Sequence, residues 1–210
     1  MQQEHTNHPL RFSVDYPEGD LNRLTTFFRL FAALPILIVL GAVSGGTWQW
    51  EDQGTAAAVG AGGLLFFGPL LMILFRQKYP QWWFDFNLQL ARFSTRVSSY
   101  LALMSDRYPS TDEEQSVHLY LEYPNVKQDL NRWLPLVKWL LAVPHYVVLF
   151  FLGIAAAFAV IFAWFAILFT GRYPQGLFDF VEGVLRWGLR VEAYALLLVT
   201  DRYPPFRLAA

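Results

Sequence analysis

The sequence predicts an all-α membrane protein in which a transmembrane helical hairpin, followed by an amphipathic interfacial helix, occurs twice in tandem. The first observation is composition: 55% of the 210 residues are hydrophobic and 18% are aromatic, whereas soluble domains are about 45–50% apolar. The second is that all 16 lysines and arginines lie outside two apolar stretches, residues 30–75 and 139–171, which have the length of membrane segments. The third is a phrase that occurs twice.

The repeated phrase is QKYPQWWFDF at residues 77–86 and GRYPQGLFDF at residues 171–180. Shorter matches flank it in the same order in both places: YP at 16–17 and 123–124, DLNR at 20–23 and 129–132, and DRYP at 106–109 and 201–204. A duplication of this length indicates that one structural unit occurs twice. We therefore predict two repeat copies, residues 12–112 and 119–208, joined by a polar and acidic connector.

Only the first copy contains the polar insertion GGTWQWEDQGT, residues 45–55. Loops tolerate insertions better than packed helices do. We therefore expect this segment to join two apolar arms, residues 24–44 and 56–75, each long enough to cross a bilayer.

The apolar stretch of the second copy, residues 133–170, has no polar insertion. One straight helix of that length would measure about 57 Å, against a hydrocarbon core of about 30 Å. We therefore predict a hairpin with a tight turn near Gly153. Its short arms either span the bilayer fully or form a re-entrant wedge.

Topology follows from the distribution of charge. With two hairpins, every lysine and arginine falls on the side of the termini, and basic residues mark the cytoplasmic side. The sequence thus predicts a multi-pass protein of the cytoplasmic membrane with cytoplasmic termini, and with residues 45–55 outside. The polar N-terminus resembles no cleaved signal peptide, so insertion is expected to depend on the first apolar arm.

Each second arm ends at a Tyr-Pro step, because proline disfavours the α conformation in the residue before it. The segments that follow, residues 82–104 and 177–200, carry polar residues at helical spacings of three and four. These are Asp85, Gln89, Arg92 and Arg96 in the first copy and Asp179, Glu182, Arg186 and Arg190 in the second. A charged stripe on an apolar helix predicts a helix that lies along the membrane surface.

The segments VPHYVVLFFLG, FAILFTGRYPQGLFDFVEGVLRW and RVEAYALLLVTDRYPPF resemble a bacterial membrane family filed as domain of unknown function 4389. The resemblance covers nearly the whole chain as two copies and is strongest in the second. The first copy departs from the pattern, with Ile36 after its proline where the second has His145. The resemblance implies an integral membrane protein and supplies no activity.

The charged stripes are candidate binding residues for anionic lipid headgroups or an acidic partner: Asp85, Arg92, Arg96, Asp179, Arg186 and Arg190. Each basic group near an anionic membrane surface adds about 1 kcal/mol of attraction. The alternative is a solvated helix face with internal ion pairs. His145 is a second candidate, because an ionisable group at membrane depth often has a function. Its alternative role is to cap a carbonyl group freed by Pro144.

Several functions find no support in the sequence. There is no cysteine, and no histidine or carboxylate lies at ligand spacing around His145, so we expect no metal site and no cofactor. We found no pattern typical of a catalytic triad, a zinc protease or a nucleotide-binding loop, and an enzyme acting on a lipid is the least favoured class. The net charge of −1 gives no reason to expect nucleic acid as a partner.

Two other classes remain. The first is a non-enzymatic scaffold or accessory subunit of the bacterial cytoplasmic membrane, with membrane lipids and a membrane protein as its partners. The second is a carrier or binder of a lipid or other hydrophobic ligand, held between the two repeats. A cavity between the repeats would favour the carrier, and a closed interior would favour the scaffold.

Overall fold

The computed structural model describes residues 8–44, 61–111, 113 and 115–209. Its elements are β1 (Leu10–Val14), α1 (Arg23–Ser44), α2 (Ala61–Arg76), α3 (Gln81–Leu101), β2 (Val117–Leu121), α4 (Val126–Asp129), α5 (Pro135–Leu141), α6 (Val143–Thr170) and α7 (Gln175–Ala195). The predicted helical character is confirmed. The all-α class is wrong, because the two short strands form a sheet. The loop expected at residues 45–55 lies outside the described residues.

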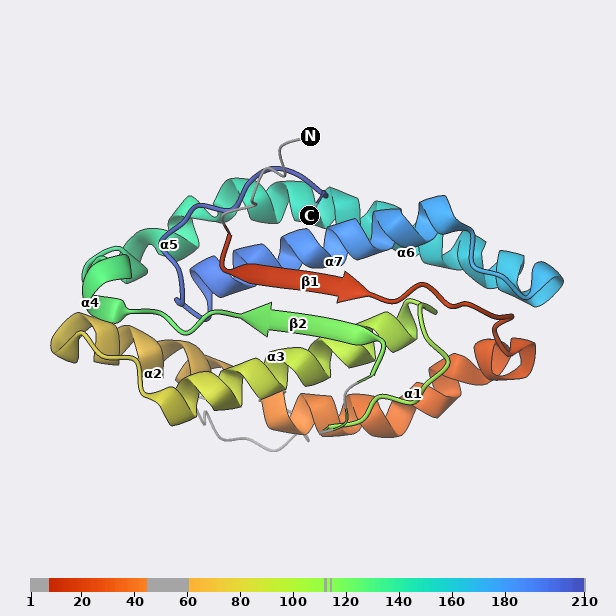
Figure 1. Ribbon diagram of the computed structural model, residues 1–210, viewed down its shortest axis with the longest axis horizontal. Coiled ribbons are helices and arrows are strands. Elements are labelled where there is room, and N and C mark those ends of the chain that lie inside the picture. Colours follow the sequence, from red (N-terminus) through yellow and green to blue (C-terminus); the bar gives the residue numbers. More distant parts are fainter. Residues whose placement is uncertain (1–7, 45–60, 112, 114, 210) are drawn as a thin grey trace, which may run out of the picture.

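The molecule is elongated, with its helices roughly along the long axis (Figure 1). The two strands lie at the centre, and α3 and α7 lie beside them. Helices α1 and α2 follow one long edge, and α5 and α6 follow the other (Figure 1). At the ends of the molecule the two edges meet, because α1 packs against α6 and α2 packs against α5.

The central ribbon joins the two halves of the chain. Strand β1 pairs with β2 in antiparallel register, with Phe12 opposite Leu119. Leu10, Phe12 and Val14 are buried and alternate with exposed residues, as expected for a strand with one face on a core. Strand β1 packs on α7 and β2 packs on α3, so each strand covers the helix of the other half.

Corresponding residues of the two halves make matching hydrogen bonds. The hydroxyl of Tyr16 donates to the carbonyl of Tyr173, and that of Tyr123 donates to the carbonyl of Tyr79. Backbone turns also match, because Leu103 and Leu198, after α3 and α7, have positive φ angles of 64° and 58°. Contacts and turns of the same kind therefore occur on both sides of the ribbon.

The two segments expected to form amphipathic helices are found as α3 and α7, each 21 residues long. Both begin directly after the proline of a Tyr-Pro step, at Pro80 and Pro174. Extended backbone at these prolines lets each chain turn sharply from an apolar helix into an amphipathic one.

The tight turn expected near Gly153 is wrong, because α6 continues without a break for 28 residues. A glycine inside a helix costs about 1 kcal/mol relative to alanine, and the alanines and large apolar residues around it keep the helix intact. The chain instead bends at Ala142, between α5 and α6 and just before Pro144. At about 1.5 Å per residue, α6 is about 42 Å long.

The outer faces of α1, α5 and α6 are apolar. In α6 the exposed large residues are Val143, Tyr146, Val147, Val148, Phe150, Phe151, Ile154, Phe158, Ile161, Phe162, Phe165 and Phe169. Only one narrow stripe of α6 is buried, at His145, Ala159, Ala163 and Ile167. By length and composition, Arg23–Ala42 and α6 are able to cross a membrane. The expectation of apolar helices of spanning length is therefore confirmed for these two.

Candidate functional site

A cavity of about 580 Å³ lies along the ribbon, between α3 and α7. Both strands line it, with residues 10–13 and 117–120, together with Gln89, Arg92, Arg96, Arg186 and Arg190. We call this cavity the basic trough. Four of the six charged candidates, the arginines, meet here, whereas Asp85 and Asp179 are exposed residues that do not line it.

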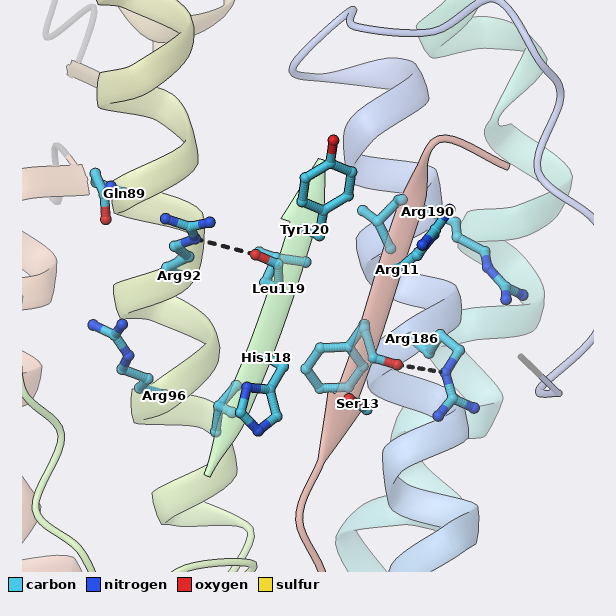
Figure 2. Close-up of a pocket in the computed structure, with 13 residues that line it drawn as sticks. Arg11, Ser13, Gln89, Arg92, Arg96, His118, Leu119, Tyr120, Arg186 and Arg190 are labelled. Atoms are coloured by element: carbon cyan, nitrogen blue, oxygen red, sulfur yellow. Dashed lines mark hydrogen bonds between the residues drawn. The ribbon is translucent and has the colours of Figure 1, made fainter. Parts of the chain in front are cut away.

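Arg92 and Arg186 hold the outer edges of the ribbon. The Nε of Arg92 donates to the carbonyl of Leu119 over 3.1 Å, and the Nε of Arg186 donates to the carbonyl of Phe12 over 3.0 Å (Figure 2). Edge strands leave backbone groups without partners and invite pairing with other chains. Each arginine donates a hydrogen bond from the neighbouring helix to one of these edge carbonyl groups.

Arg96 and Arg190, one turn further along, are buried. Arg96 donates through Nη1 to the carbonyl of Ser110, and Arg190 donates through Nη2 to the carbonyl of Ala209, each over 3.0 Å. These bonds fix the segments that follow α3 and α7. The solvated face of the alternative interpretation therefore does not describe the four arginines, which contact backbone carbonyl groups. Its internal ion pair is present, between Glu182 and Arg186.

The two walls of the basic trough differ in charge. Arg186 pairs with Glu182, four residues before it, and Glu182 also accepts a hydrogen bond from the backbone N–H of Val14 over 3.2 Å. The corresponding position before Arg92 is Leu88. Within the described part of the chain, no carboxylate pairs with Arg92.

Several positive charges lie close together at the Arg190 end of the trough. Burial, followed by repulsion from Arg186 and Arg207, lowers the pKa of Arg190 to about 10. At the same end, burial and then Arg190, Arg202 and Arg207 lower the pKa of His8 to about 4. A group carrying negative charge would relieve this repulsion.

His145 lies inside an aromatic cluster and is fully buried. Its Nδ1 accepts a hydrogen bond from Nε1 of Trp187 over 3.1 Å, and its ring stacks on Phe206 with centroids 4.0 Å apart. Its Nε2 has no hydrogen-bond partner among the described residues. The carbonyl-capping interpretation is therefore wrong: the histidine fastens α6 to α7 and to the C-terminal segment.

Two buried cations were missed by the sequence analysis. Arg29 of α1 pairs with Asp106, and Lys138 of α5 pairs with Asp201 over 2.7 Å. Each also lies over a tyrosine ring, Arg29 at 4.5 Å and Lys138 at 5.2 Å from the centroid. The available signal was position, because both cations stand six residues after the arginine of a DLNR match.

These pairs explain the repeated DRYP phrase. Asp106 and Asp201 accept hydrogen bonds from the backbone N–H groups of Asn22 and Asn131 as well as binding the cations. Each aspartate thereby fixes the start of an apolar helix, α1 or α5, to the segment that follows an amphipathic helix. We assign these residues a structural role rather than a place in a binding site.

Residues 133–207 match the family model described as Domain of unknown function (DUF4389). The match covers α5, α6, α7 and the C-terminal segment, and so includes His145, Arg186 and Arg190. No curated protein and no solved structure matches the chain.

Proposed function

We propose that this chain is a non-enzymatic scaffold or accessory protein of the bacterial cytoplasmic membrane. We propose further that it lies along the bilayer, in place of the multi-pass topology expected from the sequence. In this arrangement the apolar faces of α1, α5 and α6 sit in lipid, and the ribbon and basic trough face the cytoplasm. The observation that carries the proposal is that α6 and α7 pack side by side. The two helices must therefore take the same orientation to the membrane.

The packing of α6 on α7 is antiparallel. His145 near the start of α6 bonds to Trp187 in the second half of α7, and only residues 171–174 separate the end of α6 from the start of α7. If α6 crossed the bilayer, α7 would cross it too.

Crossing would be costly for α7. This helix carries Asp179, Glu182, Arg186 and Arg190, and a charged residue near the bilayer centre costs about 2.5–3.5 kcal/mol on insertion scales. The basic trough would also lie at membrane depth. With both helices parallel to the surface, α6 keeps its apolar face in lipid and α7 keeps its charges near water. This is the behaviour of interfacial helices.

We further propose that the two halves are copies of one unit whose strands are exchanged across the ribbon. The matching tyrosine hydrogen bonds and the matching cation–aspartate pairs support this interpretation. The arrangement presents two similar surfaces to lipids or to a membrane-protein partner, as a scaffold requires. The cytoplasmic side is inferred from the lysines and arginines that surround the ribbon and the ends of the helices.

Single cysteines test the orientation, because the chain has none of its own. Glu18 lies near the end of α6 and Lys127 lies before α5, and both are exposed. In sealed vesicles, an impermeant thiol reagent should label Glu18→Cys and Lys127→Cys from the same side. Ala157→Cys, on the exposed face of α6, should react only after detergent is added. Labelling of the first two positions from opposite sides would mean that α6 crosses.

A carrier of a hydrophobic ligand is the second candidate, and one cavity favours it. An apolar cavity of about 380 Å³ lies between α2 and α5, lined by Phe66, Phe67, Leu70, Leu136, Trp139 and Leu196. Ligand pockets measure about 300–1,000 Å³. If this cavity holds a lipid, mass spectrometry should detect one in the purified protein, and Leu196→Trp should reduce its amount. If both proteins retain the same amount of lipid, the carrier function is contradicted.

A further inference from the structure

We propose that the basic trough binds a phosphate-bearing ligand and that Arg92 makes the principal contact with it. This inference goes beyond the scaffold role and does not depend on how the helices lie in the membrane. It rests on the charge balance of the trough, on the geometry of Arg92 and on the difference between the two walls.

The charge balance is strongly positive. Five arginines and His118 line the trough, and its lining contains no aspartate or glutamate among the described residues. Glu182 of α7 contacts this set and pairs with Arg186. His118 has a carboxylate of its own, with its Nε2 3.0 Å from Asp15. Arg11 and Arg92 have no ion-pair partner in the described part of the chain.

Arg92 is held in place with its binding edge free. Its Nε is fixed by the carbonyl of Leu119, and no further hydrogen bond from this side chain is found within the described residues. The two Nη groups of an arginine match two oxygens of a phosphate in a planar, bidentate contact. Because the Nε bond already orders the guanidinium group, a ligand would lose little side-chain entropy on binding.

The surroundings of Arg92 suit a polar ligand of moderate size. Gln89 lies three residues before it on the same helix face, and the exposed Tyr120 of β2 and Ser13 of β1 also line the trough, Ser13 on the side of Arg186 (Figure 2). The volume of about 580 Å³ falls within the range of small-molecule sites. Arg11 adds a cation next to Tyr120, with its guanidinium carbon 5.9 Å from the ring centroid.

The opposite wall acts as an internal control. There Oε1 of Glu182 pairs with Arg186 and also accepts a hydrogen bond from the backbone N–H of Val14. At the corresponding place beside Arg92, Leu88 leaves the charge to be balanced from outside the protein. The trough therefore has one wall on which Arg186 is paired with a carboxylate of the protein, and one on which, within the described residues, Arg92 is not.

Inorganic pyrophosphate is a suitable first probe, measured by titration calorimetry on the full chain in an uncharged detergent. We expect binding that weakens as salt rises, because the contact is ionic. Leu88→Glu copies the second wall into the first and keeps Arg92, so it should weaken binding at least about tenfold, as expected for a lost charge-assisted contact. Glu182→Leu copies the first wall into the second and should add a second site.

A second experiment, on vesicle binding, distinguishes a soluble phosphate ligand from a lipid headgroup. Vesicles of phosphatidylcholine are compared with vesicles that also contain phosphatidylglycerol, with wild-type protein and Leu88→Glu. Binding of pyrophosphate alone indicates a soluble ligand, whereas a phosphatidylglycerol preference lost in Leu88→Glu indicates a lipid headgroup. The proposal is overturned if neither probe binds, or if Leu88→Glu binds both as well as wild type does. The cysteine labelling pattern is unaffected by any of these results.

Discussion

The amphipathic helices α3 and α7 make the same contact with the ribbon but differ in the charge beside that contact. Arg92 and Arg186 each hold the edge of a strand from the other half by the same Nε bond. Only Arg186 has a neighbouring carboxylate. The backbone contact is thus independent of the ion pair, and the pair's absence at Leu88 costs the fold nothing visible. A charge that the fold does not need to neutralise is free to recognise a ligand.

The apolar edges differ in a second way. The second half has α5 and the longer α6, with only Ala142 between them, where the first half has α1 and α2 with residues 45–60 between them. Yet both edges are fastened at corresponding places, by Arg29 with Asp106 and by Lys138 with Asp201. The fastenings, rather than the continuity of the helix, determine where each edge lies on its amphipathic helix.

The largest expected effect comes from breaking one fastening. Asp201→Asn leaves the ammonium group of Lys138, which has 0% exposure, without its counter-ion. Breaking a buried pair in this way costs about 3–5 kcal/mol, so the thermal unfolding midpoint in detergent should fall sharply. Asp20→Asn is the control, because its pair with Arg172 is exposed and such pairs contribute about 0–1 kcal/mol. Equal midpoints for the two variants would contradict a structural role for the Lys138 pair.

The next largest effect distinguishes the two apolar edges, because a glycine of α2 and a glycine of α6 have different surroundings. In Gly68→Ala, the new methyl group would lie 2.3 Å from the ring of Trp83, and overpacking of this kind costs about 1–3 kcal/mol. In Gly153→Ala, the methyl group meets nothing within 4 Å, and alanine stabilises a helix interior by about 1 kcal/mol. We expect the unfolding midpoint to fall in the first variant and to rise in the second. A lower unfolding midpoint in Gly153→Ala would favour the turn near Gly153 that the sequence predicted.

A smaller effect tests whether the halves are equivalent. Tyr16→Phe and Tyr123→Phe each remove one hydrogen bond from a tyrosine hydroxyl to a carbonyl of the other half. Each should lower the free energy of unfolding by about 1 kcal/mol. The losses should be similar and should add in the double variant, because the two bonds lie at separate ends of the ribbon. A loss confined to one variant would show that the two hydrogen bonds do not contribute equally to the free energy of unfolding.

Local pattern was sufficient to predict some of this structure. The Tyr-Pro steps and the spacing of the arginines located α3 and α7, and the apolar arms of the first half located α1 and α2. The strands were missed because five residues such as Leu10–Val14 are stable only when paired with a segment more than 100 residues away. The direction of the arginines was missed for the same reason: a stripe on a helix looks solvated until its covering ribbon is known.

The buried cations show a further limit. Arg29 and Lys138 stand near the ends of apolar arms, where long basic side chains usually reach toward the membrane surface. Their burial depends on Asp106 and Asp201, which arrive from the far ends of α3 and α7. The repeat made both aspartates visible in the sequence, but only the fold brings each to its cation.

The smallest effect concerns His8, which stands where the other half has Gln115. The pKa of His8 is lowered to about 4, first by burial and then by Arg190, Arg202 and Arg207. A histidine with a lowered pKa binds fewer protons folded than unfolded, so its stabilising effect is complete above pH 6.5 and is lost as pH falls toward 4. His8→Gln copies the other half and removes this titration. The variant's unfolding midpoint should therefore fall less than that of wild type between pH 7 and pH 5. If both midpoints fall equally, the acid sensitivity belongs to other groups, and the positive charge around His8 is weaker than its arginines suggest.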